Sequence, residues 1–401
     1  MTKIKTTRPF STPFLDKFIL TPSILPLQDK LLIKLDQQLS DYEQVFLDPE
    51  IEKSLISRNE LLASYAISKA ENSQLTLGEA EDVYQLILGN KRYQFIANKI
   101  KNKEKLTQKD HDKLEFFNIA QTFHDVNGQV FSLDKLTPEY ILNLHQQLTQ
   151  GLDVFQDYLP DYELYKSGHW RDNNAIRVGS YIPADYDVIH AGVTELVQYV
   201  LDKPTPTKIA IFHTALYALH PFNNGNKRIC RILEHLLLRG IGFNGKNLYS
   251  TSYYYHKQKE RYYKYLLFSL ERNNFNHFVA FVQEAISLSI VSVVQLSLQS
   301  KRRDLLSTQS PSVQTILRPL IKRRELQFKN LFKRSKKKMA RQTFVNYLDE
   351  AVSAGVVTRD QRGRSVYYSL KLTTNEQDSV ANWLQLLQPK LSHIPDSISL
   401  A

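Results

Sequence analysis

Residues 220–231 constrain the fold most, because they end one helical pattern and begin another. Apolar residues recur at helical spacing through residues 208–219, and the same spacing resumes after the break. The break contains a proline, two asparagines and Gly225, which form a loop that cannot continue a regular helix. The start of the second helix, with Lys227 in its first turn, is suited to hold an anion, and His220 at the edge of the loop is suited to accept a proton. The stretch therefore predicts phosphate binding beside a general base.

Length and composition are those of a globular protein with two or three domains, since 42% of the 401 residues are hydrophobic and 11% are aromatic. Residues 1–12 lack the apolar segment of a signal peptide, and the apolar run near residues 286–298 is too short and too polar to span a bilayer. We expect a cytoplasmic protein with no membrane partner. Cys230 is the only cysteine, so no intrachain disulfide or cysteine-based zinc site is possible, and its helical spacing favours a packed core thiol over a nucleophile.

Positive charge is concentrated in one segment. Residues 301–370 contain 17 Lys or Arg against 5 Asp or Glu, whereas the net charge of the whole chain is +11. The rest of the chain is therefore close to neutral, as in an ordinary enzyme, and residues 301–370 predict an appended module that meets an anionic partner.

Glu71 occupies an unfavourable position in the predicted helical pattern. Residues 61–72 have helical spacing that ends at Asn72, and Thr76 or Ser73 is suited to cap the next helix. A carboxylate in the last turn of a helix opposes the helix dipole, so we expect a cation elsewhere in the chain to compensate Glu71. The alternative is an exposed glutamate at a helix end.

Two further segments bear on function. Residues 170–182 change from helical spacing to Asn-rich turn residues and alternation, which predicts a short β-hairpin packed on the helices as a flap. Residues 252–263 are crowded with tyrosines, which either pack helices against each other or form an aromatic wall for a nucleobase. Spacing does not choose between these two interpretations.

The basic segment has a pattern of its own. Short helical segments at residues 313–320 and 325–332 precede a helix at 340–355 and two strands around a basic turn, which is the element order of a winged helix-turn-helix. Such a module places its third helix in the major groove of DNA, and the alternative is a solvated charged face on a protein–protein module. The predicted DNA-binding residues are Lys337, Lys338, Arg341, Gln342, Arg362 and Arg364.

The sequence of residues 220–231, His-Pro-Phe-Asn-Asn-Gly-Asn-Lys-Arg-Ile-Cys-Arg, resembles the signature of the Fic family, His-Pro-Phe-x-(Asp/Glu)-Gly-Asn-(Gly/Lys)-Arg-x-x-Arg. Other segments agree in order. Residues 60–80 resemble the family's inhibitory segment, through the run from Ile67 to Asn72 followed by Leu75 and Thr76. Residues 168–183 resemble its target-docking flap, and Tyr262 and Tyr263 resemble its nucleotide-side tyrosines. The resemblance covers residues 30–370. In this family the catalytic domain is frequently accompanied by a C-terminal winged helix.

The resemblance implies a protein adenylyltransferase that inhibits itself. His220 would remove the proton of a target Ser, Thr or Tyr hydroxyl, whose oxygen would attack the α-phosphate of ATP with departure of pyrophosphate. Glu71 would pair with Arg231 and occupy the guanidinium that the γ-phosphate needs. The implied ATP-binding residues are Glu71, Val178, Gly179, Phe222, Gly225, Asn226, Lys227, Arg228, Arg231, Tyr262 and Tyr263.

Two residues depart from the usual family pattern. Asn224 stands where the family usually has Asp or Glu to hold Mg²⁺, and an amide oxygen is a weaker ligand for a hard cation. Mg²⁺ is therefore expected as a cofactor with a weakened metal ligand. Lys227 replaces the commoner glycine, as in the Doc-like kinase branch of the superfamily. A lysine here would alter how the phosphates of the nucleotide lie in the pocket.

These patterns predict a mainly α fold, with a Fic helical core, a β-hairpin flap and a C-terminal winged helix-turn-helix. The predicted segments are an N-terminal helical region with the inhibitory segment (1–100), a catalytic core (101–299), the winged helix (300–375) and a tail (376–401). The expected partners are a target protein with a hydroxyl side chain and DNA through residues 301–370, and homodimerisation stays open. Two alternatives remain beside AMP transfer: AMP removal or phosphate transfer at the same site, and a DNA-binding regulator with a weakly active core.

Overall fold

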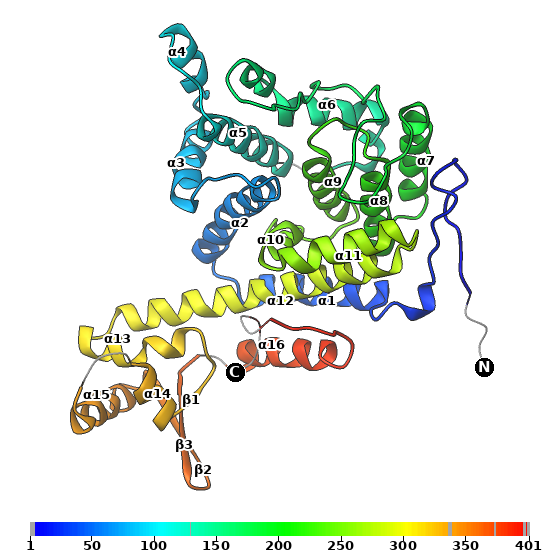
Figure 1. Cartoon of the computed structure of the whole chain (residues 1–401). Coiled ribbons are helices and arrows are strands. Elements are labelled where there is room, and N and C mark those ends of the chain that lie inside the picture. Colours follow the sequence, from blue (N-terminus) through cyan, green and yellow to red (C-terminus); the bar gives the residue numbers. More distant parts are fainter. Residues whose placement is uncertain (1–4, 129, 336–338, 373, 396–397, 399–401) are drawn as a thin grey trace. The chain divides into compact units, whose positions relative to one another are not determined.

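The computed structural model describes residues 5–128, 130–335, 339–372, 374–395 and 398, and the fold is mainly helical (Figure 1). The chain forms two compact units. The first comprises Met1–Asp36 and Ile56–Ser289, and the second comprises Gln37–Leu55 and Ile290–Ala401. Three helices contribute residues to both units: α1 (Asp29–Phe46), α2 (Pro49–Lys69) and α12 (Asn276–Ser307).

The remaining helices of the first unit carry the candidate site. They are α3 (Leu77–Leu88), α4 (Phe95–Lys101), α5 (Gln108–Asn127), α6 (Pro138–Thr149), α7 (Ile189–Leu201), α8 (Pro206–Leu219), α9 (Asn226–Gly240), α10 (Thr251–Lys257) and α11 (Lys259–Glu271).

Local signals in the sequence set several of these helix ends. Thr76 caps α3 in a capping box with Glu79, and Thr137 caps α6 ahead of a proline at the first helical position. Helix α2 ends at Lys69, and Asn72 follows with φ of 62°, the left-handed conformation that asparagine tolerates. The predicted termination of the helix at Asn72 and the predicted Thr76 cap are confirmed.

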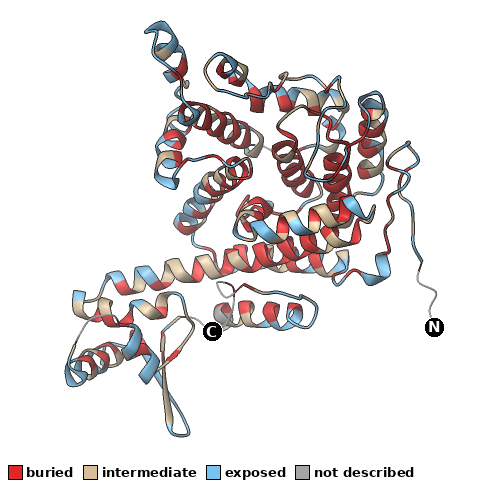
Figure 2. Cartoon of the chain, in the orientation of Figure 1, coloured by how far each residue is buried: buried red, intermediate tan, exposed pale blue. Residues whose placement is uncertain are grey.

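Helices α8 and α9 form the centre of the first unit. They pack on each other, α7 packs on α8, and nearly every residue of both central helices is buried (Figure 2). Cys230 is buried within α9, which confirms the predicted core thiol. A helix buried on all sides tolerates few rearrangements, so the loop between α8 and α9 is held at both ends by rigid elements.

The predicted hairpin at residues 170–182 is present as one antiparallel bridge. The backbone N–H of Val178 and that of Tyr181 each donate to the other's carbonyl at 3.0 Å, around a turn at Gly179 with φ of 60°. Ser180 at this turn donates to Glu271 of α11 at 2.6 Å, and the hydroxyl of Tyr181 donates to the carbonyl of Ala218 in α8 at 3.3 Å. Residues 171–184, which we call the flap, are thus attached to the helical core.

The second unit contains the predicted order of three helices and a two-stranded hairpin. Helices α13 (Pro311–Leu317), α14 (Phe328–Arg334) and α15 (Arg341–Ser353) precede strands β2 (Val357–Arg362) and β3 (Ser365–Leu370). A short strand, β1 (Leu326–Gln327), pairs with β3 to give an antiparallel sheet of order β1-β3-β2. Its core is an apolar cluster that includes Ile316, Leu331, Phe344, Leu348 and Tyr368.

Two elements differ from the sequence analysis. Helix α12 continues to Ser307, beyond residue 299, and residues predicted as a tail form α16 (Thr374–Leu387). The hydroxyl of Tyr42 and the ammonium of Lys301 lie 2.8 and 2.6 Å from the carboxylate of Glu376, so polar contacts anchor α16 within this unit. The four-segment division of the chain stays a prediction.

Helix α12 contains the apolar run near residues 286–298, which the sequence predicts to be too short and too polar to span a bilayer. By length and composition the whole helix is long and apolar enough to do so, and it is the one such helix among the described residues. Within the protein, 78% of its apolar window is buried. Burial of an all-round apolar helix by protein is the pattern of a core helix.

Candidate functional site

His220 ends α8 and takes the left-handed conformation, with φ of 51° and ψ of 61°. The side chain is buried and packs edge-on against Tyr217, with ring centroids 5.2 Å apart. Burial, and secondarily the positive charge of Arg171, lower the pKa of His220 to about 4. The imidazole is therefore neutral at pH 7 and free to accept a proton.

The loop after His220 is held by its own side chains. Asn226 accepts from the backbone N–H of Phe222 at 3.0 Å and donates to its carbonyl at 2.8 Å, which closes the loop on itself. Phe222 is fully buried and stacks on His145, with ring centroids 3.8 Å apart and planes 5° apart. The side chains of Phe222 and Asn226, predicted to contact ATP, are thus committed to the loop.

His145 fixes the loop from α6. Its Nδ1 accepts from the backbone N–H of Gly168 at 3.1 Å, so Nε2 carries the proton and donates to the carbonyl of Asn224 at 3.0 Å. Burial lowers the pKa of His145 to about 4, so this arrangement persists at neutral pH. Gly225 follows with φ of 88°, and a Cβ there would lie 3.2 Å from His145 Nε2, so glycine is required. Gly225 is the N-cap of α9 and supplies no capping side chain to its N–H groups.

Glu71 pairs with a cation, as expected, but the cation is Lys227 and not Arg231. Its Oε2 lies 3.0 Å from Nζ of Lys227, and both side chains are about one-fifth exposed. Burial acts to raise the pKa of Glu71, but the charges of Lys227, Arg228 and Arg231 outweigh it, so the pKa lies below its ordinary value. The predicted pairing of Glu71 with Arg231 is therefore wrong in this structure: Arg231 donates instead to the carbonyl of Ala66, at 3.2 Å.

Lys227 contacts both Ala70 and Glu71, which directly follow α2. Nζ of Lys227 also lies 3.5 Å from the carbonyl of Ala70 and 5.4 Å from the ring centroid of Tyr263. The hydroxyl of Tyr263 donates to that Ala70 carbonyl at 2.8 Å. Lys227 and Tyr263 thus dock residues 70–71 against the start of α9.

Arg228 is completely buried and its charge is already balanced. Its Nη1 pairs with Oε1 of Glu115 in α5, and its Nη2 donates to Oδ1 of Asn224 at 3.0 Å. Burial acts to lower the pKa of Arg228, but Glu115, Tyr165 and Glu71 together outweigh it, so the pKa lies above its ordinary value and the guanidinium stays charged. The Glu115 carboxylate also lies 3.3 Å from the hydroxyl of Tyr165. Glu115 was not predicted as a site residue.

The guanidinium of Arg231 packs against the aromatic rings of two tyrosines. Its guanidinium carbon is 4.4 Å from the ring centroid of Tyr262 and 5.5 Å from that of Tyr255. Tyr262 is fully buried, so it supports Arg231 and does not offer a face to a nucleobase. Packing is the interpretation that holds for Tyr254, Tyr255 and Tyr262, all of which are buried.

Asn224 does not fit the predicted metal role. Its side-chain oxygen accepts from the guanidinium of Arg228 at 3.0 Å and from the backbone N–H of Gly225 at 2.8 Å. An oxygen turned toward two donors, one of them cationic, is a poor ligand for Mg²⁺. Among the residues that the structure describes, no group of three or more His, Cys, Asp or Glu side chains is arranged to hold a metal ion.

The remaining predicted residues are at the surface. Val178 is half-buried and Gly179 exposed at the flap turn, while Arg341, Gln342, Arg362 and Arg364 are exposed in the second unit. Arg362 pairs with Glu325 and Asp360, each at 2.7 Å. Lys337 and Lys338 lie outside the described residues.

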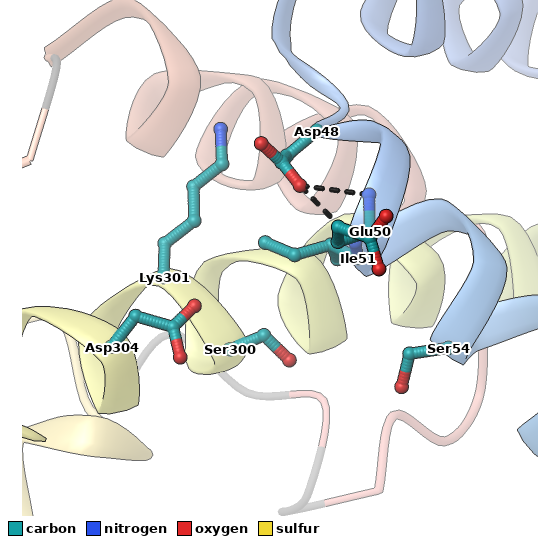
Figure 3. A pocket seen from close by; sticks show the side chains of 7 residues that line it. All are labelled: Asp48, Glu50, Ile51, Ser54, Ser300, Lys301 and Asp304. Atoms are coloured by element: carbon teal, nitrogen blue, oxygen red, sulfur yellow. Dashed lines mark hydrogen bonds between the residues drawn. The ribbon is translucent and has the colours of Figure 1, made fainter.

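A separate cavity of about 450 Å³ lies in the second unit (Figure 3). Its lining includes Asp48, Glu50, Lys301 and Asp304. Asp48 caps α2 by accepting from the backbone N–H of Glu50 at 2.9 Å, and Lys301 donates to the carbonyl of Phe46 at 2.6 Å. Two of the polar side chains that line this cavity, Asp48 and Lys301, are thus already hydrogen-bonded to the backbone of the fold.

Residues 135–238 match the model of the Fic/DOC family. Among solved structures, the chain is similar to a Fic family protein from Desulfovibrio desulfuricans G20, with 18% identity, coverage of 87% of this chain and 98% of that chain, and a TM-score of 0.49. It is also similar to residues 134–508 of Fic-1 from C. elegans (17% identity, 66% and 72% coverage, TM-score 0.48).

A third similar structure is a Fic domain-containing signaling protein from Bacteroides thetaiotaomicron VPI-5482, with 19% identity, coverage of 67% of this chain and 96% of that chain, and a TM-score of 0.46. No curated protein matches the chain. Residues 135–238, over which the chain matches that family model, contain the loop from His220 to Arg231.

Proposed function

We propose that this protein transfers AMP from ATP to a hydroxyl side chain of a target protein. The observation that carries the proposal is a buried, neutral His220 at the end of α8, followed directly by the cationic start of α9. A base and an anion site on one rigid loop are what phosphoryl and nucleotidyl transfer need. Buried guanidinium nitrogens support an anion site, since Nε of Arg228 and Nε of Arg231 have no hydrogen-bond partner.

In the proposed reaction, His220 takes the proton of the target hydroxyl as its oxygen bonds to the α-phosphorus of ATP. The bond from that phosphorus to the bridging oxygen breaks, and pyrophosphate leaves with the electron pair. The imidazolium then returns its proton to pyrophosphate or solvent. Lys227 and the backbone N–H groups at the start of α9 stabilise the phosphate charge. No step relies on Asn224 as a metal ligand, because its oxygen faces donors.

We propose that Glu71 inhibits this reaction through Lys227. The carboxylate holds the ammonium at 3.0 Å, where the phosphates of ATP compete for the same charge. Tyr263 stabilises the docked segment through the Ala70 carbonyl. Removal of the carboxylate is expected to free Lys227 and raise the transfer rate.

The test uses ATP labelled at the α-phosphate or at the γ-phosphate with wild type, Glu71→Ala and Glu71→Ala/His220→Ala. Protein labelling from the α-label alone, raised by Glu71→Ala and lost with His220, supports AMP transfer. Labelling from the γ-label alone would establish phosphate transfer instead, the alternative that Lys227 favours. Glu81→Ala is the matched control, because Glu81 is an exposed glutamate of α3. No labelling by any variant with a broad set of cell proteins as targets would contradict both activities.

We propose in addition that residues 301–370 bind DNA. Three helices, a hairpin and an excess of cations support this partner, with Arg341 and Gln342 exposed at the start of α15 and Arg364 exposed at the hairpin turn. DNA binding would bring the transferase activity to particular sites in the cell.

A further inference from the structure

Arg171, at the start of the flap, is buried and bonded almost entirely to backbone carbonyls. Its Nε donates to the carbonyl of His220 at 2.7 Å, and Nη1 donates to the carbonyl of Asn173 at 2.5 Å. Nη2 donates to the carbonyl of Ala184 and, at 3.3 Å, to that of Leu219. The side chain is 3% exposed, so these bonds are shielded from water.

The four carbonyls belong to two separate parts of the chain. Asn173 and Ala184 lie near the two ends of the flap, whereas Leu219 and His220 form the last turn of α8. One guanidinium thus joins both ends of the flap to the residue that carries the proposed base. The backbone adds a parallel link, because the N–H of Arg171 donates to the carbonyl of Pro221 at 2.8 Å.

The bonds from Arg171 to the end of α8 satisfy carbonyl groups that the helix itself leaves without partners. The last carbonyls of a helix lack intrahelical partners, and a cation there is favoured by the helix dipole. His220 holds a left-handed backbone conformation that a residue with a side chain adopts only with support. Arg171 supplies that support with a planar fork of donors that a lysine ammonium cannot reproduce.

We propose that Arg171 is a positioning residue that fixes the backbone of His220 and the flap at one mutual spacing, and this role rests on the proposed transfer reaction. The flap would present the target hydroxyl and His220 would remove its proton. A single side chain that holds both keeps the hydroxyl and the imidazole in register for attack.

The charge of Arg171 has a second effect on the same histidine. The charged groups that act on the His220 imidazole are Arg171 and Lys227, which disfavour its protonated form, and Glu71, which favours it. Arg171 forms no ion pair with a carboxylate among the described residues, and the nearby charge of Asp185 only partly offsets the effect of burial on its pKa, which is lowered. A variant that keeps the charge but loses the fork separates the two effects.

The experiment compares Arg171→Lys and Arg171→Met with wild type in two measurements that need no ATP. One is the NMR titration of the His220 ring, assigned by its loss in His220→Asn. The other is cleavage after Arg177, an exposed flap residue, by an arginine-specific protease. Arg177→Met is the matched control, because within the described part of the chain this arginine donates to the carbonyls of Asn174 and Ile176 in its own loop. It also confirms the cleavage site.

Both variants are expected to speed cleavage after Arg177 by about tenfold, since the flap opens more often. Only Arg171→Met is expected to raise the titration midpoint of His220, while Arg171→Lys keeps it near the wild-type value. Wild-type cleavage in a folded Arg171→Lys, checked by thermal unfolding, would overturn the proposal. If the His220 midpoint and the cleavage rate both change as expected but the protein labels no target, the positioning role of Arg171 stands and only the proposed transfer reaction is rejected.

Discussion

The carboxylate of Glu71 and the ammonium of Lys227 form an ion pair 3.0 Å long between the end of α2 and the start of α9. Burial acts to lower the pKa of Lys227, but the charge and hydrogen bond of Glu71, together with Tyr263, raise it above its ordinary value, and the pKa of Glu71 is lowered in turn. Each residue keeps its partner charged, so the pair persists throughout the neutral pH range.

Lys227 is predicted to be the main phosphate cation once Glu71 is removed. Lys227→Met in a Glu71→Ala background should raise the KM for ATP about tenfold, because it loses one charge-assisted bond. Steady-state labelling at varied ATP measures this effect. Lys264→Met, which changes an exposed lysine of α11, is the control and should leave KM unchanged. An unaltered KM in the Lys227 variant would assign the phosphates to other cations.

The pH dependence of labelling should reveal the shifted base. Only neutral imidazole accepts a proton, so the rate falls as the pH drops through the pKa of His220, which is about 4. In Glu71→Ala the midpoint should lie no higher, because the Glu71 charge acts to raise that pKa. Initial rates between pH 4.5 and 8 are expected to be nearly flat. A midpoint near 6.5 would mean that His220 is exposed to solvent in the active state.

Acid should destabilise the fold before carboxylates protonate. Burial lowers the pKa of His145 and His220 to about 4 and that of His235 to about 3. The unfolded chain binds protons at these sites below about pH 6.5 and the folded chain does not, so stability is complete above that pH and declines toward pH 4. Each buried ring contributes on the order of 3 kcal/mol to this decline.

Urea unfolding at pH 7 and pH 4.5 measures that difference in stability. His235→Gln should reduce it, because one buried histidine no longer titrates. Equal free energies of unfolding at the two pH values in wild type would show that these rings protonate within the folded state.

Replacement of Asn224 by Asp should change the metal requirement. The Asn224 oxygen accepts from two donors, whereas an aspartate would add a negative charge and a second oxygen that favour Mg²⁺. Asn224→Asp is therefore expected to lower the Mg²⁺ concentration for half-maximal labelling by about tenfold. Asn223→Asp adds the same charge one residue earlier and is the control. Identical Mg²⁺ curves for wild type and Asn224→Asp would indicate that the loop does not approach the metal carried by ATP.

DNA binding should depend unequally on the arginines of the second unit. Arg362 is paired with Glu325 and Asp360, whereas Arg341 and Arg364 are exposed without an ion pair among the described residues. Arg341→Ala and Arg364→Ala should each reduce the slope of log affinity against log salt by about 0.9, and Arg362→Ala by less. Fluorescence anisotropy with a mixed-sequence duplex measures the slope. A duplex bound equally by all variants would place the contact elsewhere.

Features that depend on neighbours in sequence were predictable. The cap at Thr76, the termination at Asn72 and the loop before α9 all follow from local backbone chemistry. That Glu71 needs a cation also followed, because the unfavourable dipole interaction is local. Which cation it meets did not follow, since Lys227 and Arg231 lie one turn apart on α9 and only the tertiary packing of α2 selects between them.

The supporting residues of the site were missed for the same reason. Arg171, His145 and Glu115 act on the loop and its arginines from elements far away in sequence. A weak signal was present for Arg171, as an arginine directly after a tryptophan at the start of an Asn-rich turn. The sequence contains no comparable signal for Glu115, which resembles any other carboxylate of an amphipathic helix.

Lys227 serves both the proposed resting contact and the proposed nucleotide contact, and this double use limits how inhibition can be lost by mutation. A change at Lys227 that releases Glu71 also removes the ammonium from the phosphates. A genetic selection for hyperactive variants should therefore recover substitutions around Ala70 and Glu71 and at Tyr263, and very few at the lysine itself. The two halves of one ion pair are thus expected to differ sharply in their tolerance to change, although they contribute equally to the same bond.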